Sequence, residues 1–263
     1  MDRAGLLSRT GALIAAIETE AFAPALTDLL RSMAPYTYTV VFGYSGSARP
    51  LDLYDDFPAS KRRIFVTDYQ EGPYLLDPFY LAATRPVPAG LHRMRDLAPD
   101  RFYQGEYFRN YYVQTGLAEE IGFFVDIPEG VMVVLSLMRD ERPFSTREMR
   151  SLEEVRPVVE AVIRQHWADL PSRFDLCSQD RLGSAIATEL ERSFQSFGDG
   201  LLTAREREIV EHTLKGHSAD AVGRILDISP GTVRTHRRNI YAKLRISSQG
   251  QLFSRFIETL ARA

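Results

Sequence analysis

Residues 228–244 read ISPGTVRTHRRNIYAKL, and their capping, spacing and charge predict one amphipathic helix. Ser229 suits the N-cap position, and Pro230 suits the first helical turn, where its missing N–H costs no hydrogen bond. Residues that can pack recur at three- and four-residue steps on one face, namely Val233, His236, Ile240 and Leu244. The opposite face carries Arg234, Arg237, Arg238 and Tyr241. The sequence therefore predicts a helix from Pro230 with one packed face and one cationic face.

Three further helices are predicted around this one. Thr203 and Glu206 form a capping box at the start of the first helix, which Gly216 ends. Ser218 caps a second, short helix that only a brief turn separates from the cationic helix. Residues 248–251 form another box at the start of a fourth helix. The C-terminal part is therefore predicted as an all-α, four-helix domain with a helix-turn-helix at its centre.

Residues 202–260 resemble the LuxR-type helix-turn-helix domain, which also occurs in the NarL and FixJ response regulators. The likeness covers the order of all four helices and rests on Glu206, Gly216, Leu226, Ser229, Thr232, Val233, His236, Ile240, Lys243 and Leu244. It implies that two copies of the chain bind a two-fold symmetric promoter site, with residues 230–244 in the major groove.

The same resemblance assigns roles along this helix. Phosphate contacts would come from Thr232 and Lys243. The other DNA-binding residues would be Arg234, Thr235, Arg237 and Arg238, and the three arginines lie where family members meet bases. The arginine fork matches the two acceptors on the major-groove edge of guanine. The sequence departs from the family at Asp220, where a lysine is usual; a carboxylate in a first helical turn instead favours the helix dipole.

Charge is divided between the two ends of the chain. From residue 201 onward there are eleven Lys and Arg against six Asp and Glu, a net charge of +5. The first 200 residues hold 21 basic and 29 acidic side chains, a net charge of −8. A basic tail on an acidic body is typical of a nucleic-acid reader attached to a second module.

Length and composition exclude several classes. The chain has 263 residues, 44% of them apolar, which suffices for one sizeable core and a small domain. It contains no run of eighteen apolar residues and no signal-peptide pattern, so we expect a cytoplasmic protein without a membrane partner. The single cysteine, Cys177, excludes internal disulfides and agrees with a reducing compartment.

The first 170 residues are predicted as α/β (α+β), with an antiparallel sheet and flanking helices. We expect a helix over 13–30, a strand over 36–42 and a hairpin from strands 121–127 and 131–138. Ser145 and Glu148 form a third capping box, ahead of a long helix toward Trp167. Such a fold is typical of PAS- or GAF-like sensors that enclose a small molecule.

Two breaks divide the chain, one at Pro171–Ser172 and one at residues 198–200. They predict a sensor domain at 1–170, a helical linker at 171–200 and the DNA-binding domain at 201–263. The linker carries an apolar stripe at helical spacing: Leu182, Ile186, Leu190, Phe194 and Phe197. The fourth C-terminal helix carries another: Leu252, Phe253, Phe256, Ile257 and Leu260. The sequence leaves open which of the two stripes forms a dimer interface.

Part of the first domain also resembles the autoinducer-binding domain of LuxR proteins, through Phe57–Pro58, Tyr69 and residues 74–79. By that resemblance, Asp77 would accept a hydrogen bond from an acyl-homoserine lactone. The pocket would be lined by Tyr69, Tyr74, Phe79, Tyr107 and Tyr111. Asp77 followed by Pro78 is also a helix N-cap, and the two roles are compatible.

A run of aromatic residues favours a second ligand hypothesis. Its members are Phe102, Tyr103, Tyr107, Phe108, Tyr111 and Tyr112. Stripes of this kind are most often core, but Glu119 and Glu120 follow closely. Rings and carboxylates together favour a cationic amine, through ring faces and counter-charge. The sequence leaves both an acyl-homoserine lactone and an amine open as the effector.

Two other functions stay open at this stage. A response regulator or a partner-controlled DNA-binding protein would need no small molecule, although residues 1–35 predict a helix where a receiver domain needs a buried strand. An enzyme is a remote alternative, because the five histidines lack metal-ligand spacing and no phosphate loop or nucleophile motif occurs. The main prediction is a one-component transcriptional regulator without catalytic site or cofactor. Its expected partners are promoter DNA, a small-molecule effector, a second copy of the chain and RNA polymerase.

Overall fold

The computed structural model describes residues 3–84, 87–105, 108–109, 116–179, 197–198 and 200–260. Most of the predicted linker stripe, together with Tyr107, Tyr111 and Tyr112, lies outside these residues. Within them, no helix combines the length and the apolar character that a membrane span requires.

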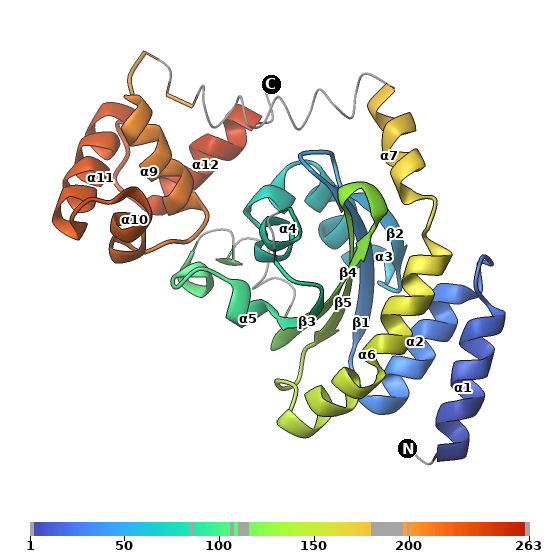
Figure 1. The fold of residues 1–263 in the computed structure, drawn as a ribbon. Helices are drawn as coiled ribbons and strands as arrows, with labels where there is room; N and C mark the ends of the chain where they lie inside the picture. The colour runs from blue at the N-terminus through green and yellow to red at the C-terminus, as the bar shows by residue number, and fades with distance from the viewer. Residues whose placement is uncertain are drawn as a thin grey trace.

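A five-stranded antiparallel sheet forms the centre of the first domain (Figure 1). In spatial order its strands are β2 (Leu51–Asp55), β1 (Tyr38–Ser45), β5 (Val131–Arg139), β4 (Glu119–Ile127) and β3 (Gly90–Arg93). The predicted hairpin is confirmed: β4 and β5 pair through the short turn at Pro128–Gly130. The predicted strand near residue 40 starts two residues later than expected and continues to Ser45.

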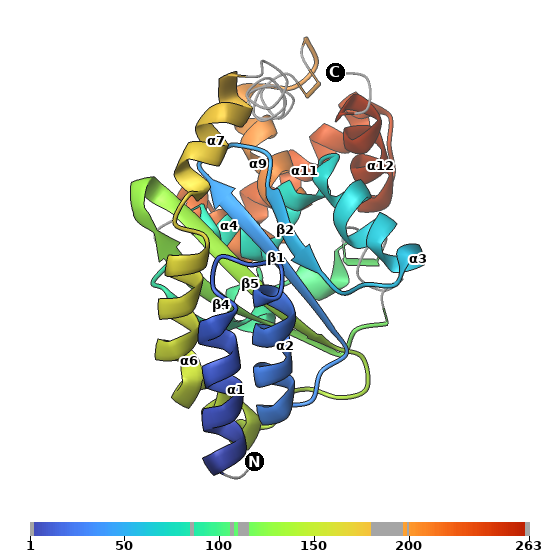
Figure 2. The same cartoon turned by 90° about the vertical axis from the view of Figure 1, so that its right-hand side faces the viewer.

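Four helices cover one face of this sheet (Figure 2). They are α1 (Arg3–Ala15), α2 (Phe22–Met33), α6 (Thr146–His166) and α7 (Leu170–Gln179). The capping box that opens α6 is present as predicted, with Ser145 and Glu148 exchanging hydrogen bonds. Leu170 and Phe174 of α7 pack in the same core, so the start of the predicted linker is held on the first domain.

The predicted single helix over residues 13–30 is wrong. The chain breaks between α1 and α2, where Glu18 adopts the left-handed conformation with φ of 64°. The Glu18 backbone N–H donates to His166 Nδ1 at 3.0 Å, which fixes the turn against the end of α6. The break lets both α1 and α2 bury apolar residues in the core on this face of the sheet.

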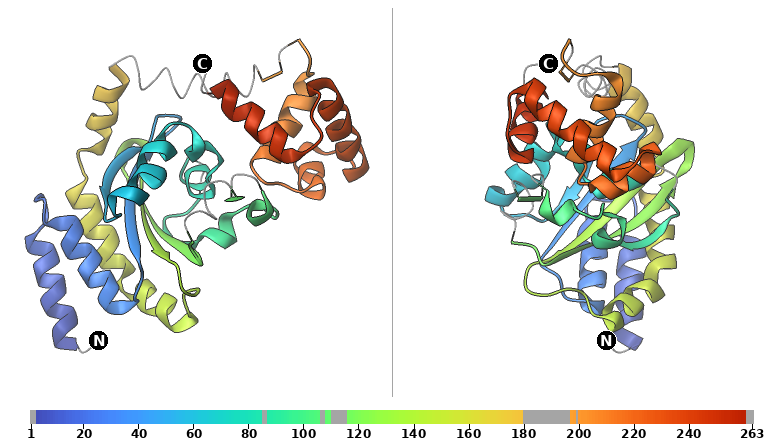
Figure 3. Two further views of the ribbon diagram at one scale, coloured as in Figure 1. Left: turned by 180° about the vertical axis from the view of Figure 1, so that it is seen from behind. Right: turned by 90° about the vertical axis from the view of Figure 1, so that its left-hand side faces the viewer.

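The other face of the sheet carries short, irregular elements. They are α3 (Ala59–Arg62), the π-helix η1 (Arg63–Asp68), the 3₁₀ turn η2 (Pro73–Leu76), α4 (Pro78–Ala83), α5 (Met94–Leu97) and the 3₁₀ turn η3 (Phe102–Gln104). Figure 3 shows that the C-terminal helices lie on the same side of the sheet as α4 and α5, away from α1 and α2. The fold class predicted for the first domain is confirmed.

The C-terminal domain is all-helical, as predicted. Its helices are α9 (Ala204–Leu214), α10 (Ala219–Leu226), α11 (Pro230–Leu244) and α12 (Gln249–Leu260). Thr203, Ser218 and Ser229 each accept a backbone N–H at the start of a helix, as expected from their N-cap positions. A Cβ on Gly223 would lie 2.7 Å from the Ile228 carbonyl oxygen, so the close turn between α10 and α11 needs a glycine there.

Candidate DNA-binding helix and sensor site

Helix α11 presents one polar face to solvent. Val233, Ile240 and Leu244 are buried against α9 and α10 as expected, and the Ser229 hydroxyl accepts the Thr232 N–H at 3.0 Å. The exposed face includes four of the predicted DNA-binding residues: Thr232, Arg234, Thr235 and Arg238. This face combines cations with small polar groups, the composition that a major-groove reader needs.

The three arginines of α11 differ in how they are held. Arg237 is half-buried and donates to Gln249 Oε1 at 3.1 Å, so its guanidinium is tied to α12. Arg234 forms an ion pair with Asp220 at 3.7 Å, and both side chains are more than half exposed. An exposed pair of this kind is weak, so phosphate or a base can displace Asp220. Arg234 and Arg238 are therefore the arginines most accessible to DNA in this conformation.

Lys243 has a partner inside its own domain. Its ammonium donates to both oxygens of Glu206, at 2.9 and 2.7 Å. Burial alone would raise the pKa of Glu206, but hydrogen bonds from Lys243 and Thr203 outweigh burial and lower it. The Glu206 side chain is 5% exposed and that of Lys243 is 38% exposed. Lys243 thus neutralises a buried carboxylate and still reaches the surface.

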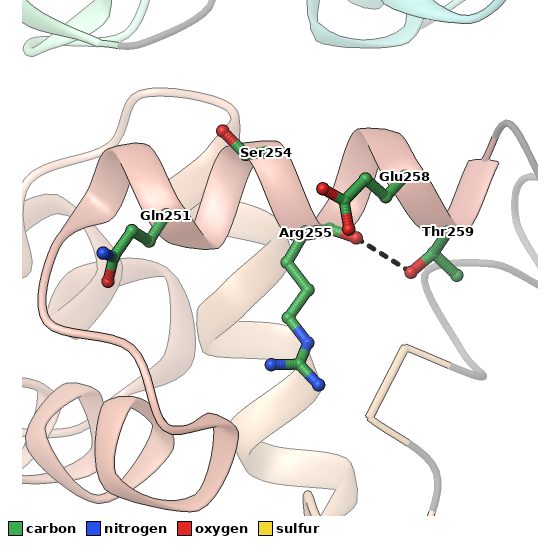
Figure 4. A pocket seen from close by; sticks show the side chains of 5 residues that line it. All are labelled: Gln251, Ser254, Arg255, Glu258 and Thr259. Carbon is green, nitrogen blue, oxygen red and sulfur yellow. Dashed lines mark hydrogen bonds between the residues drawn. The ribbon is translucent and has the colours of Figure 1, made fainter.

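The outer face of α12 is polar (Figure 4). A hollow of about 430 Å³ there is lined by Gln251, Ser254, Arg255, Glu258 and Thr259. Three residues of the predicted apolar stripe, Leu252, Phe253 and Phe256, are buried in the domain's own core. The side chains of Ile257 and Leu260 lie outside the described residues. A dimer contact through α12 therefore stays a prediction.

Five aromatic rings form a closed circle beside the sheet, which we call the aromatic circle: Phe42, Tyr44, Tyr80, Tyr74 and Tyr69. Each ring contacts the next, with centroids between 4.9 and 6.1 Å apart. Phe42 and Tyr44 come from β1, and the other three come from the segment between η1 and α4. The Tyr74 side chain is fully buried, and its hydroxyl has no hydrogen-bond partner among the described residues.

Asp77 lies beside the aromatic circle. Its Oδ1 accepts the Phe79 N–H at 2.9 Å, which confirms the predicted N-cap of α4. Its Oδ2 accepts the Tyr69 hydroxyl at 2.7 Å, and the hydroxyls of Tyr69 and Tyr44 lie 3.0 Å apart. Burial raises the pKa of Asp77 to about 6, although these two hydrogen bonds oppose the rise. The carboxyl therefore holds its proton at a higher pH than an exposed aspartate does.

A second buried carboxyl, Glu120, interacts with the first. Alternation along β4 places Glu120 on the same sheet face as Phe124, towards the aromatic circle. The side chain hydrogen-bonds to Ser136 of β5, and the residue is 5% exposed. Burial and the neighbouring charge of Asp77 raise its pKa well above the ordinary value. Among the described lysines and arginines, none forms an ion pair with Asp77 or Glu120.

The structure brings together Tyr69, Tyr74 and Asp77 from the predicted ligand set. Phe79 packs edge-on against Phe124 at 5.2 Å, below this cluster. Tyr107 and Tyr111 lie outside the described residues. Glu119, paired with Glu120 in the amine hypothesis, instead forms an ion pair with Arg93 on the neighbouring strand. Tyr44 was missed because it is distant in sequence, although its alternation with Phe42 along a strand was a usable signal.

The two domains meet at the α9–α10 turn. The Asp100 carboxylate accepts the Ser218 N–H at 2.9 Å, and the Arg101 N–H donates to the Gly216 carbonyl at 3.0 Å. A Cβ on Gly216 would lie 3.0 Å from the Phe102 Cα, so the backbones approach closely. Beside this contact is a groove of about 340 Å³, lined by Pro78, Leu81, Ala82, Val87, Leu97, Ala98, Pro99, Lys215 and His217. Helix α4 thus runs from Asp77 to the domain boundary.

An α/β domain with a buried polar cluster, joined to a helix-turn-helix with an exposed cationic face, defines a DNA-binding regulator with a sensor-like module. The family model described as bacterial regulatory proteins, luxR family, matches residues 200–256. An HTH-type transcriptional regulator from the exeN 3′ region of Aeromonas salmonicida is 32% identical over 189 residues, covering 71% of this chain and 96% of the relative. The chain belongs to the LuxR family of helix-turn-helix transcriptional regulators, and it is not an enzyme.

Two further comparisons extend over the first domain. The monoamine regulon transcriptional regulator of Klebsiella aerogenes is 25% identical over 248 residues, covering 93% of this chain and 94% of the relative. Among solved structures, the LBD domain of VqsR from Pseudomonas aeruginosa superposes with a TM-score of 0.54 and 25% identity, over 62% of this chain and 96% of that one. The first domain is therefore of the ligand-binding type.

Proposed function

We propose that this chain is a one-component transcriptional regulator whose promoter affinity is set by a small molecule in the first domain. The observation that carries the proposal is the aromatic circle with Asp77, a buried polar site inside a domain of ligand-binding type. The buried Tyr74 hydroxyl has no partner among the described residues, and the buried Asp77 carboxyl has hydrogen bonds but no cation beside it. A bound ligand would supply a partner for the hydroxyl and a further donor for the carboxyl.

DNA contacts are proposed for the exposed face of α11. We assign base contacts to Arg234 and Arg238, and phosphate contacts to Thr232 and Thr235. Arg237 and Lys243 stay in the proposed set, but each must first leave its partner, Gln249 or Glu206. A homodimer on a two-fold site, acting on RNA polymerase in the cytoplasm, completes the proposal.

We further propose that α4 transmits the presence of the ligand. Asp77 caps this helix on the side of the aromatic circle, while Leu81 and Ala82 line the groove facing Lys215 and His217. A ligand that displaces the Asp77 carboxyl would shift α4 and so change the contact at the α9–α10 turn. The domain divisions at 1–170, 171–200 and 201–263 are part of the same proposal.

The relatives supply candidate effectors. The name of the Klebsiella aerogenes relative refers to a monoamine regulon, which favours an amine, and an acyl-homoserine lactone is the alternative from the sequence resemblance. The test is promoter binding by the full chain, measured by fluorescence anisotropy with each compound present. We expect at least one compound to change the affinity, and the Asp77→Asn variant to lose that response. Equal promoter affinity with every compound that binds the first domain would contradict the proposal.

A further inference from the structure

Among the described residues of the first domain, two buried carboxyls have no counter-cation. Asp77 is 8% exposed and Glu120 is 5% exposed. The charge of Asp77 acts on Glu120, and the groups around the two carboxyls include the hydroxyls of Tyr69, Ser136, Tyr44 and Tyr103 and the Phe79 N–H. Two buried carboxylates without a cation cannot both ionise at low cost. A cation placed beside the two carboxyls would therefore favour ionisation of both.

Two other buried carboxylates in this chain each form an ion pair with a cationic side chain. Glu119, next to Glu120 on β4, pairs with Arg93, and Glu206 pairs with Lys243. The charge of Arg49 acts on the Tyr74 hydroxyl of the aromatic circle rather than on either carboxyl. Its guanidinium forms an ion pair with Glu71. The absence of a protein cation is thus specific to Asp77 and Glu120 within the described residues.

The rings around these carboxyls are suited to a cation. Tyrosine and phenylalanine faces attract an ammonium group within about 6 Å of the ring centroid. The aromatic circle provides five such rings in mutual contact, and the fully buried Tyr74 hydroxyl is an unused acceptor for an N–H donor. A neutral acyl amide could donate one hydrogen bond to Asp77, but it would leave Glu120 without a partner of opposite charge.

We propose that Asp77, Glu120 and the aromatic circle bind the ammonium group of an organic amine, and that this amine is the effector. The inference rests on the proposed function, because it names the chemical class of ligand for the same site. Asp77 would accept one N–H of the ammonium and Glu120 a second. The proton held in the empty site would leave to solvent when the amine enters, so that charge is balanced.

The test is isothermal titration calorimetry on the full chain with matched amines and alcohols. The pairs are 2-phenylethylamine with 2-phenylethanol and hexylamine with 1-hexanol, and N-octanoyl homoserine lactone serves as the neutral acyl probe. We expect an amine to bind at least about tenfold more tightly than its alcohol, as charge-assisted hydrogen bonds require. Titration at pH 6.5 in buffers of different ionisation enthalpy should show release of close to one proton per amine.

Two variants separate the site from a structural effect. Glu120→Gln keeps the shape and the Ser136 neighbour, and it should weaken amine binding at least about tenfold while abolishing proton release. Glu129→Gln removes an exposed carboxylate from the turn of the same hairpin and should change neither quantity. Thermal unfolding of both variants verifies that they are folded.

Three results would overturn the inference. They are equal binding of amine and alcohol, no amine bound at 10 mM, or amine binding that Glu120→Gln leaves intact. Tight lactone binding with an altered promoter affinity would overturn the amine assignment while leaving the proposed function in place. Amine binding with proton release but no effect on promoter affinity would sustain the amine site and contradict the proposed function instead.

Discussion

Helix α11 and the aromatic circle are the two proposed binding regions of this chain, and they are built in opposite ways. The α11 face consists of exposed cations on one continuous helix, each close in sequence to its neighbours. The sensor site consists of buried carboxyls and tyrosines gathered from β1, β4 and the η1–α4 segment. An exposed charge is stable without its ligand, whereas a buried unpaired charge is not. Only the sensor site therefore changes its energetics strongly when occupied.

The largest effect should come from removing the exposed arginines. The double variant Arg234→Ala/Arg238→Ala should weaken binding to the preferred promoter by about 2–6 kcal/mol, since each good base contact is worth about 1–3 kcal/mol. Binding to random duplex should fall much less. The double variant Arg147→Ala/Arg150→Ala, which removes two exposed arginines from α6, is the charge-matched control. Equal losses on promoter and random DNA would show that α11 does not discriminate bases.

A second prediction concerns pH and Asp77. The folded-state pKa of about 6 exceeds the ordinary 3.8, so the native state holds the proton more tightly than the unfolded chain does. The resulting stability is fully present below about pH 3.8 and is lost as pH rises through 6. From pH 4.5 to 7.5, the wild type should lose about 2 kcal/mol relative to Asp77→Asn, in which asparagine still caps α4. Urea unfolding of both proteins at the two pH values measures this difference. The same change in unfolding free energy with pH for both proteins would refute the raised pKa of Asp77.

Lys243 provides a slightly smaller test, within the DNA-binding domain. Lys243→Met should destabilise the protein by about 1–3 kcal/mol because Glu206 is left buried and unpaired, and partial exposure of the lysine keeps the loss below that of a fully buried pair. Adding Glu206→Gln should recover most of the loss. If Lys243 also contacts phosphate, the slope of log affinity against log salt should fall by about one. An unchanged unfolding free energy would indicate that the ion pair is unimportant.

The smallest expected effect lies at the contact between the two domains. Asp100→Ala removes the carboxylate that accepts the Ser218 N–H, a partly buried bond worth about 1 kcal/mol by analogy with helix caps. The variant should bind its effector normally but transmit less of that binding to promoter affinity. Asp100→Asn retains an acceptor and should behave like the wild type. A full effector response in Asp100→Ala would exclude this route of coupling.

The same contrast explains which features the sequence could predict. Ser218, Ser229 and the Thr203–Glu206 box act within three or four residues, so local pattern was enough to place α9, α10 and α11. The hairpin was likewise visible from its alternation and its turn. The break at Glu18 was missed because it depends on packing against His166, 148 residues away.

The sensor site was only partly predictable for a related reason. The resemblance to the autoinducer-binding domain pointed to Asp77, Tyr69 and Tyr74, and the local Asp–Pro pattern separately predicted that Asp77 caps a helix. Glu120 was noted as an acid near aromatics, but its partner was taken to be Glu119 rather than Asp77. Neighbouring residues on a strand point to opposite faces of the sheet, so the side chains of Glu119 and Glu120 cannot share one site. The tertiary fold alone decides which distant carboxyl each of them meets.

The most direct measurement is selection of duplexes from a randomised library by the full chain, with and without 2-phenylethylamine. The proposed account predicts enrichment of a two-fold symmetric sequence, a recovery that changes when the amine is present, and a shifted base preference for Arg234→Ala. Failure of the folded wild-type chain to enrich any sequence under either condition would contradict the claim that α11 reads promoter DNA under control of the sensor site.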